Sequence, residues 1–184
     1  MNLEMVMPEL CHLVPHSGSM LLLDRVLAFD SESLSAEVTI RPDSLFATPQ
    51  GVGSWVGIEY MAQAIAAYAG CQAQQRGEAV KIGFLLGSRR YEAACPHFAQ
   101  GSVLQIEVHR ALQGENGLGA FECKIWHSDS QLAKATVTVF QPPNVDEFLQ
   151  EIAIKGQYEK NGVGDRFLAR NRQGDCAAAG ARRL

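Results

Sequence analysis

Residues 54–72, with the sequence SWVGIEYMAQAIAAYAGCQ, constrain the fold more than any other stretch. Nearly every position is apolar or small, so a helix here would be buried on most of its circumference. Glu59 and Gln63 interrupt the pattern and, being four residues apart, lie one above the other on the same helical face. A carboxylate in such a setting needs a partner or a chemical task. We expect a buried central helix with Ser54 as its N-cap and Glu59 as a candidate functional residue.

Extended segments flank this helix on both sides. A loop at 41–53 leads into the helix, and Gly77 is expected to end it. Strands before and after one long helix, joined by short turns, predict an α+β fold with an antiparallel sheet wrapped around the helix. The predicted strands are 20–29, 33–40, 81–86 with an extension over 89–94, 102–112, 119–128 and 131–141.

The chain ends in a region of different composition. We expect residues 1–143 to form the domain, and residues 144–184 to hold a short amphipathic helix, over 145–154, and a tail. From residue 156 onward the sequence is rich in Gly, Arg and Ala without periodicity. Such a composition predicts a loosely held tail.

The overall composition is that of an ordinary globular protein. The 184 residues are 47% hydrophobic and 20% charged, with a net charge of -4, which gives no global case for nucleic-acid or anionic-membrane binding. No apolar run reaches the roughly 20 residues that span a bilayer. Five scattered cysteines without a CxxC pair, and an N-terminus unlike a signal peptide, indicate a cytoplasmic protein. Without a metal-ligand spacing or a Gly-rich phosphate loop, we expect no metal and no cofactor.

Three segments resemble one family. GIEYMAQAIAAYAG (57–70) resembles the central-helix motif of hotdog-fold 3-hydroxyacyl-[acyl-carrier-protein] dehydratases of the FabZ type, in which a Glu and a Gln stand in the same relation. VPHSGSMLLLDRV (14–26) resembles the N-terminal signature of that family, and residues 82–108 look like its later segment. The helix start WVGIEYMAQ is similar to the divergent ApeP-like dehydratases of aryl polyene biosynthesis. The resemblance implies a hotdog fold.

One departure from the family pattern concerns the active site. The catalytic His of the family lies in a His-Phe-Pro-Gly stretch before the helix, a position that falls near Leu45 and Phe46 here. No His occurs between Val26 and Cys95. In the resembled family the site lies at a dimer interface, with His from one subunit and the acid from the other. The departure favours a heterodimer with a second hotdog dehydratase that supplies the base; a homodimer is the alternative.

The implied reaction is the loss of water from a 3-hydroxyacyl thioester, giving a 2-enoyl thioester. It needs a base, an acid and donors that stabilise the enolate. Glu59 is the candidate acid, and Gln63 would hold Glu59 or a water. His16 is the histidine best placed by motif, although it is not the catalytic one of the family. Candidates for binding the thioester oxygen are the helix-start amides of Gly53, Ser54, Trp55 and Val56.

Each of these residues also has a plain structural interpretation. Glu59 and Gln63 would then be polar anchors, and His16 a loop histidine that bonds to backbone groups. At the level of function, the alternatives are a hotdog acyl thioesterase and a non-catalytic partner subunit of an active dehydratase. The partner implied by the resemblance is an acyl carrier protein with a phosphopantetheine-linked acyl chain.

Carrier proteins are acidic, so docking would use local positive charge. Arg89 and Arg90 form the obvious candidate pair, and Arg110 is a further candidate. The alternative for any such pair is a solvated surface.

Overall fold

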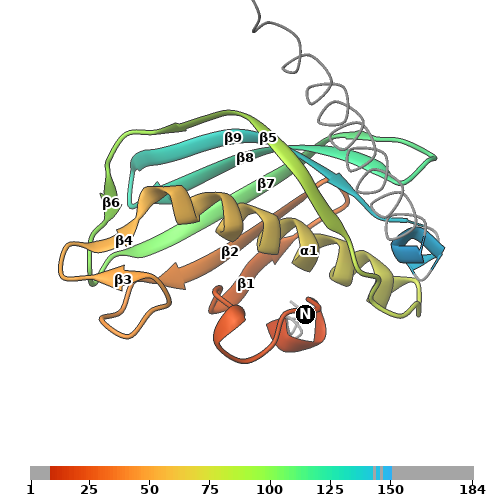
Figure 1. The fold of residues 1–184 in the computed structure, drawn as a ribbon, viewed down its shortest axis with the longest axis horizontal. Coiled ribbons are helices and arrows are strands. Elements are labelled where there is room, and N and C mark those ends of the chain that lie inside the picture. The colour runs from red at the N-terminus through yellow and green to blue at the C-terminus, as the bar shows by residue number, and fades with distance from the viewer. Residues whose placement is uncertain (1–8, 143, 146, 151–184) are drawn as a thin grey trace, which may run out of the picture. The chain divides into compact units, whose positions relative to one another are not determined.

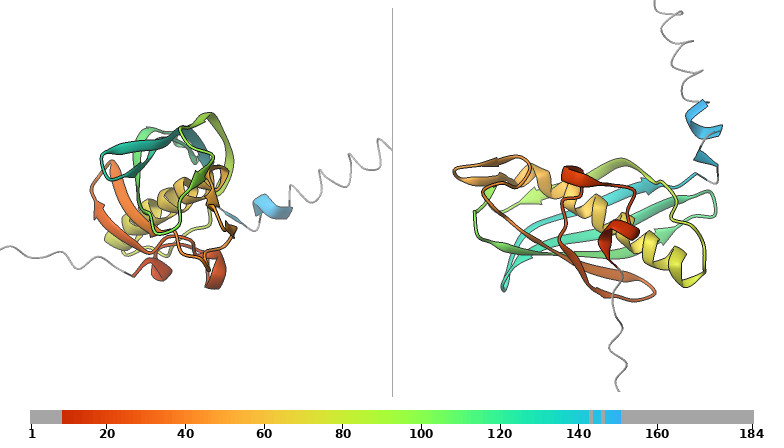
Figure 2. Two further views of the ribbon diagram at one scale, coloured as in Figure 1. Left: turned by 90° about the vertical axis from the view of Figure 1, so that its left-hand side faces the viewer. Right: turned by 90° about the horizontal axis from the view of Figure 1, so that it is seen from below.

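The central helix and the sheet that wraps it are both present. The structure, a computed structural model, describes residues 9–142, 144, 145 and 147–150. Helix α1 (Gly57–Gln75) lies against a six-stranded sheet that curls around it (Figure 1, Figure 2). The α+β prediction, with an antiparallel sheet around one long helix, is confirmed.

The large sheet has the strand order β1-β2-β7-β8-β9-β5, and each of its pairs is antiparallel. Its strands are β1 (Arg25–Phe29), β2 (Ser33–Thr39), β7 (Val103–Gln113), β8 (Leu118–His127), β9 (Ser130–Phe140) and β5 (Phe84–Ala93). A small sheet, with the order β3-β4-β6, lies near the N-terminal end of α1 (Figure 1). It consists of β3 (Ala47–Thr48), β4 (Gly51–Gly53) and β6 (His97–Phe98).

Alternating side chains of the large sheet form the core with α1. Along β2 every second residue is buried, and these residues stand opposite buried residues of β7. Successive side chains of a strand point to opposite faces, so one face of this pair is apolar. The cross-strand pairs are Leu34 with Val108, Ala36 with Ile106 and Val38 with Leu104. From the helix side, Met61, Ala64 and Ala67 are fully buried in the same core.

The N-terminal segment crosses α1 in close contact. It contains two short 3₁₀ helices, η1 (Leu10–His12) and η2 (Gly18–Met20). Leu13 is fully buried, and a Cβ atom placed on Gly70 would lie 2.1 Å from the carbonyl oxygen of Leu13. Only a glycine in α1 permits this approach, so Gly70 sets where the N-terminal segment passes over the helix.

Several element boundaries differ from those predicted. The strand predicted at 20–29 is wrong in its first half, because β1 begins only at Arg25, after η2 and an irregular segment. The loop predicted at 41–53 contains β3 and β4. The strand predicted at 81–86 begins at Phe84 and continues through 89–93 as β5.

Of the two predicted ends of the central helix, the start is wrong and the end is confirmed. Ser54 is not its N-cap: it opens a 3₁₀ turn, η3 (Ser54–Val56), and α1 begins at Gly57. The helix ends where expected, because Gly77 has φ +66 just beyond the C-cap Arg76. The Glu78 N–H donates to the Ala73 carbonyl at 2.8 Å, which closes the end in the way typical of a glycine stop.

The chain divides into two units, Met1–Pro143 and Asn144–Leu184, and each is described by itself. In the second unit the described residues 144, 145 and 147–150 include a helical turn, in which the Phe148 N–H donates to the Asn144 carbonyl at 3.2 Å. The rest of the predicted helix at 145–154 and the predicted loose tail lie outside the described residues. That residues 1–143 fold as one domain stays a prediction. Among the described residues, no helix has the length and apolarity needed to cross a membrane.

Replacing Gly70 by Ala tests the close crossing. The added methyl group would overlap the Leu13 backbone, so we expect the free energy of unfolding to fall by about 1–3 kcal/mol. Denaturant unfolding followed by circular dichroism measures this change. Gly87→Ala is the matched control, because nothing lies within 4 Å of a Cβ built at Gly87. Equal stability of the two variants would contradict the crossing.

Candidate functional site

Gln63 joins the central helix to the N-terminal segment. Its side chain is fully buried and lies on α1, one turn after Glu59. The amide nitrogen Nε2 donates to the Met20 carbonyl at 2.8 Å and to Glu59 Oε1 at 3.0 Å. The amide oxygen Oε1 accepts the Leu22 N–H at 2.9 Å. Gln63 therefore holds Glu59 and the segment around residues 20–22 in fixed positions, and a carboxylate-holding role was one of the two predicted from the sequence.

His16 faces Glu59 within the same chain. His16 Nε2 lies 3.6 Å from Glu59 Oε1, and the two side chains are 30% and 33% exposed. The other ring nitrogen, Nδ1, is buried and has no hydrogen-bond partner in the described part of the chain. The apolar helix pattern suggested a buried carboxylate, but Glu59 reaches the surface of a cleft and is only partly covered. The structure thus brings together the three residues proposed as catalytic: Glu59, Gln63 and His16.

A cleft with a volume of about 290 Å³ opens from this group along α1. Its wall on the helix is a row of small side chains, each half-buried: Ala62, Ala66, Ala69 and Ala73. From Glu59 to Ala73 the helix rises about 21 Å, at 1.5 Å per residue. Apolar side chains line the cleft as well, among them Tyr68, Phe84, Phe121 and Phe140. The cleft is therefore long and largely apolar, with Glu59 at one end.

This cleft could not be read from the sequence. The small residues of the helix suggested only that the sheet approaches closely. Their spacing of four, three and four residues was the available signal, because it puts all four alanines on one helical face. The aromatic residues come from separate strands, and only the folded sheet brings them to the helix.

The residues at the helix start lie apart from the cleft. The Ser54 N–H donates to the Pro96 carbonyl at 3.0 Å, so this amide is already used. Gly53 pairs with His97 in the small sheet, and the Trp55 side chain is 63% exposed. None of the residues 53–56 lines the cleft. Binding of a thioester oxygen by the amides of Gly53, Ser54, Trp55 and Val56 stays a prediction, although the Ser54 amide already has a partner.

The predicted docking arginines occupy different places. Arg89 and Arg90 are exposed on β5, and neither lines the cleft. Arg110 does line it, with its guanidinium carbon 5.9 Å from the centre of the Tyr68 ring. A cation over an aromatic face is attracted to the ring, so Arg110 also holds the cleft wall in place.

Asp24, in the N-terminal signature VPHSGSMLLLDRV, holds neighbouring segments of the fold together. Burial favours its protonated form, but hydrogen bonds from Arg41 and from the Thr39 N–H outweigh this effect and hold the pKa of Asp24 below its ordinary value. The Asp24 N–H donates to the Glu37 carbonyl at 2.8 Å. These bonds hold Asp24 against β2, whereas Gln63 holds the preceding residues Met20 and Leu22 against α1.

Replacing Gln63 by Leu tests whether its hydrogen bonds hold the N-terminal segment against α1. Leucine keeps the bulk but leaves the Leu22 N–H and the Met20 carbonyl without their partner, so we expect a loss of about 2 kcal/mol or more in the free energy of unfolding. Chemical denaturation gives the value. Gln75→Leu, an exposed change on the same helix, should be near neutral. A stable Gln63→Leu variant would show that the junction is not needed to hold the segment.

Comparison with known protein families and solved structures identifies the family of this chain. The chain matches the ApeP-like family, described as ApeP dehydratase, over residues 8–150. No curated protein sequence matches it. Among solved structures it is similar to the dehydratase heterocomplex ApeI:P from Xenorhabdus doucetiae, with 32% identity, a TM-score of 0.72, and coverage of 79% of this chain and 97% of that one.

More distant structures show only the shared fold. One is a hypothetical thioesterase with coenzyme A from Streptococcus pneumoniae, with 15% identity, a TM-score of 0.51, and coverage of 64% of this chain and 84% of that one. Another is the virulence protein Cj0977 from Campylobacter jejuni, with 15% identity, a TM-score of 0.53, and coverage of 73% and 88%. The family match extends over most of the chain, and the hotdog fold predicted from the sequence is confirmed. The chain belongs to the ApeP-like dehydratase family.

Proposed function

We propose that this chain is a subunit of a 3-hydroxyacyl-[acyl-carrier-protein] dehydratase in aryl-polyene-type synthesis, and that it works with a second hotdog dehydratase. The observation that carries the proposal is the Glu59 carboxyl group, oriented by Gln63 and His16 at one end of the cleft along α1. The similar heterocomplex ApeI:P supports a partner of the same fold. The reducing cytoplasm is the proposed location, in keeping with free thiols at Cys11, Cys71, Cys95 and Cys123.

Glu59 is the proposed acid. Gln63 and His16 both approach Oε1, and in the described part of the chain Oε2 makes no hydrogen bond. Oε2 is therefore the oxygen free to meet the substrate. A base removes the C2 proton, the electrons of that bond form the C2–C3 double bond, and the C3–O bond breaks. A protonated Glu59 gives its proton to the leaving hydroxyl, which departs as water.

The base comes from the partner in this proposal. His16 is 3.6 Å from Glu59, and in this role it positions the carboxyl group. The residues near the family position of the catalytic histidine, Leu45 and Phe46, have no proton-accepting side chain. An alternative has a specific observation behind it: His16 itself is close enough to the site to act as the base of a lone, active chain.

The edge of the large sheet supports a partner. In the described part of the chain β5 pairs with β9 on one side only. Leu85 and Leu86 on this strand are exposed. An exposed edge strand with apolar side chains invites pairing with another chain, so a second hotdog subunit would cover both the edge and the leucines.

Activity of the purified chain, alone and mixed with a hotdog dehydratase that carries the His-Phe-Pro-Gly stretch, tests this proposal. We expect 2-enoyl product, followed by mass spectrometry of the carrier-bound acyl group, only with the partner. Glu59→Gln in this chain should lower the rate about 10²–10⁴-fold, the usual worth of a positioned acid, and the exposed control Glu115→Gln should not.

The other outcomes separate the alternatives. Full activity of the lone chain that is lost in His16→Ala would overturn the partner's role and assign the base to His16. Free thiol without enoyl product would identify a thioesterase. Unchanged activity of the complex with Glu59→Gln would leave this chain as a non-catalytic subunit.

Arg89 and Arg90 are the proposed docking residues for the carrier protein. Because they lie outside the cleft, reversing their charge should weaken docking and leave the chemistry intact. In the Arg89→Glu, Arg90→Glu double variant we expect KM for an acyl carrier protein substrate to rise about tenfold, with an unchanged kcat. KM for the same acyl group on a short pantetheine thioester is the control and should not change. An equal rise for both substrates would contradict docking at this pair.

A further inference from the structure

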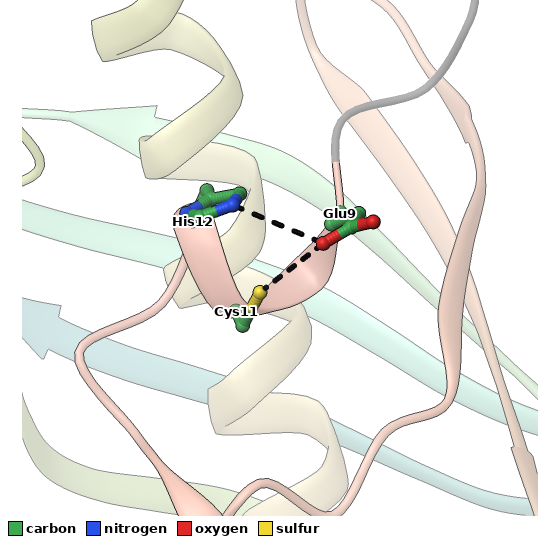
Figure 3. A group of neighbouring side chains, drawn as sticks. All are labelled: Glu9, Cys11 and His12. Atoms are coloured by element: carbon green, nitrogen blue, oxygen red, sulfur yellow. Dashed lines mark hydrogen bonds and ion pairs between the residues drawn. The ribbon is translucent and has the colours of Figure 1, made fainter.

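The first described turn of the chain brings three metal-binding side chains together. Glu9 is the N-cap of η1, Cys11 and His12 lie within η1, and all three side chains are exposed (Figure 3). Residues three apart in a 3₁₀ helix lie directly over one another, which places His12 above Glu9. Cys11 and His12 both point toward the same carboxylate oxygen. Their spacing is shorter than that of zinc-finger motifs, which is why the sequence led to the expectation of no metal.

The distances fit a tetrahedral ion. Glu9 Oε2 lies 3.7 Å from Cys11 Sγ and 3.8 Å from His12 Nε2. The potential ligand atoms all lie within 4.8 Å of one another. Around a tetrahedral Zn²⁺, with bonds of about 2.0–2.3 Å, neighbouring ligand atoms are about 3.3–3.7 Å apart. Small side-chain rotations are enough to close the group around one ion.

The backbone that carries the three ligands is anchored. Leu10, Leu13 and Val14 are buried in the core, whereas Glu9, Cys11 and His12 are exposed on the other side of the turn. The close contact between Leu13 and Gly70 of α1 fixes the end of the turn. A ligand group on an anchored turn loses less conformational freedom on binding than one on a free chain.

We infer that Glu9, Cys11 and His12 bind a zinc ion. A thiolate, an imidazole and a carboxylate are the ligands that Zn²⁺ takes, whereas Mg²⁺ and Ca²⁺ prefer oxygen alone. Three protein ligands leave the fourth position for water. Binding requires the thiolate form of Cys11, whose proton goes to solvent. None of the three residues lines the cleft at Glu59, so this is a separate site.

The test uses the full chain without a histidine tag, with ZnCl₂ as the titrant in calorimetry and Co²⁺ as a spectroscopic substitute. We expect one equivalent of zinc to bind with a micromolar or lower Kd, and Co²⁺ to give a sulfur-to-metal charge-transfer band. Glu9→Gln, Cys11→Ser and His12→Ala should each weaken binding at least about tenfold, which is about 1.4 kcal/mol. The matched controls, at residues outside the group, are Glu115→Gln, Cys95→Ser and His97→Ala.

A second measurement keeps the result independent of protein folding. Zinc should slow the alkylation of Cys11, measured by peptide mass spectrometry, and a chelator should restore the rate. The metal-free variants should melt at the temperature of the unchanged protein, because all three side chains are exposed. Zinc binding that the three variants leave unchanged, the same loss in the controls, or no binding at micromolar zinc would each overturn the site.

Discussion

The fold and the candidate site depend on one buried amide. Gln63 is fully enclosed, and both ends of its side chain are used: Nε2 donates twice and Oε1 accepts once. A buried amide with an unmet bond would cost about 1–3 kcal/mol, so this group is stable only when the N-terminal segment is in place. The same bonds that join the segment to α1 also fix the Glu59 carboxyl group. The position of the segment around residues 20–22 and the position of the Glu59 carboxyl group therefore depend on the same side chain.

This coupling explains why the sequence was misleading at residues 20–24. Leu21, Leu22 and Leu23 are apolar and suggested a strand, and Leu23 is indeed buried. The backbone of this segment, however, bonds to a side chain: Met20 and Leu22 both bind Gln63. In a strand, the Leu22 N–H and the Met20 carbonyl would instead pair with the backbone of a neighbouring strand. The tertiary contact prevailed over local β propensity, and a single side chain 41 residues away carries it.

Elements with a strong period were predicted well, and those that depend on distant partners were not. The strands β7, β8 and β9 differ from their predicted bounds by only one residue at each end, since alternation over ten or more residues marks one buried face. The two-residue strands β3 and β6 have no such period. At the site, the motif identified Glu59, Gln63 and His16, but nothing local showed that a cleft runs along the alanine row.

The loop around Phe46, which precedes the central helix, has contacts of its own. Phe46 has φ +67, a conformation that is strained for a bulky residue. Such strain costs about 1–3 kcal/mol and persists only when other contacts require it. The Phe46 ring packs edge-on against Trp55, with ring centres 5.4 Å apart. An aromatic pair therefore lies just before the start of the helix.

The exposure of Glu59 and His16 bears on how such a site works. Charged and polar groups act on a substrate most strongly where water is excluded, because the effective dielectric constant is low there. In the single chain both side chains are about one-third exposed, so water reaches the carboxyl group. The cleft has an apolar wall, and its end at Glu59 is open to solvent. In the proposed complex, a partner subunit would then have two tasks: to bring the base, and to exclude water from the reacting end of the cleft.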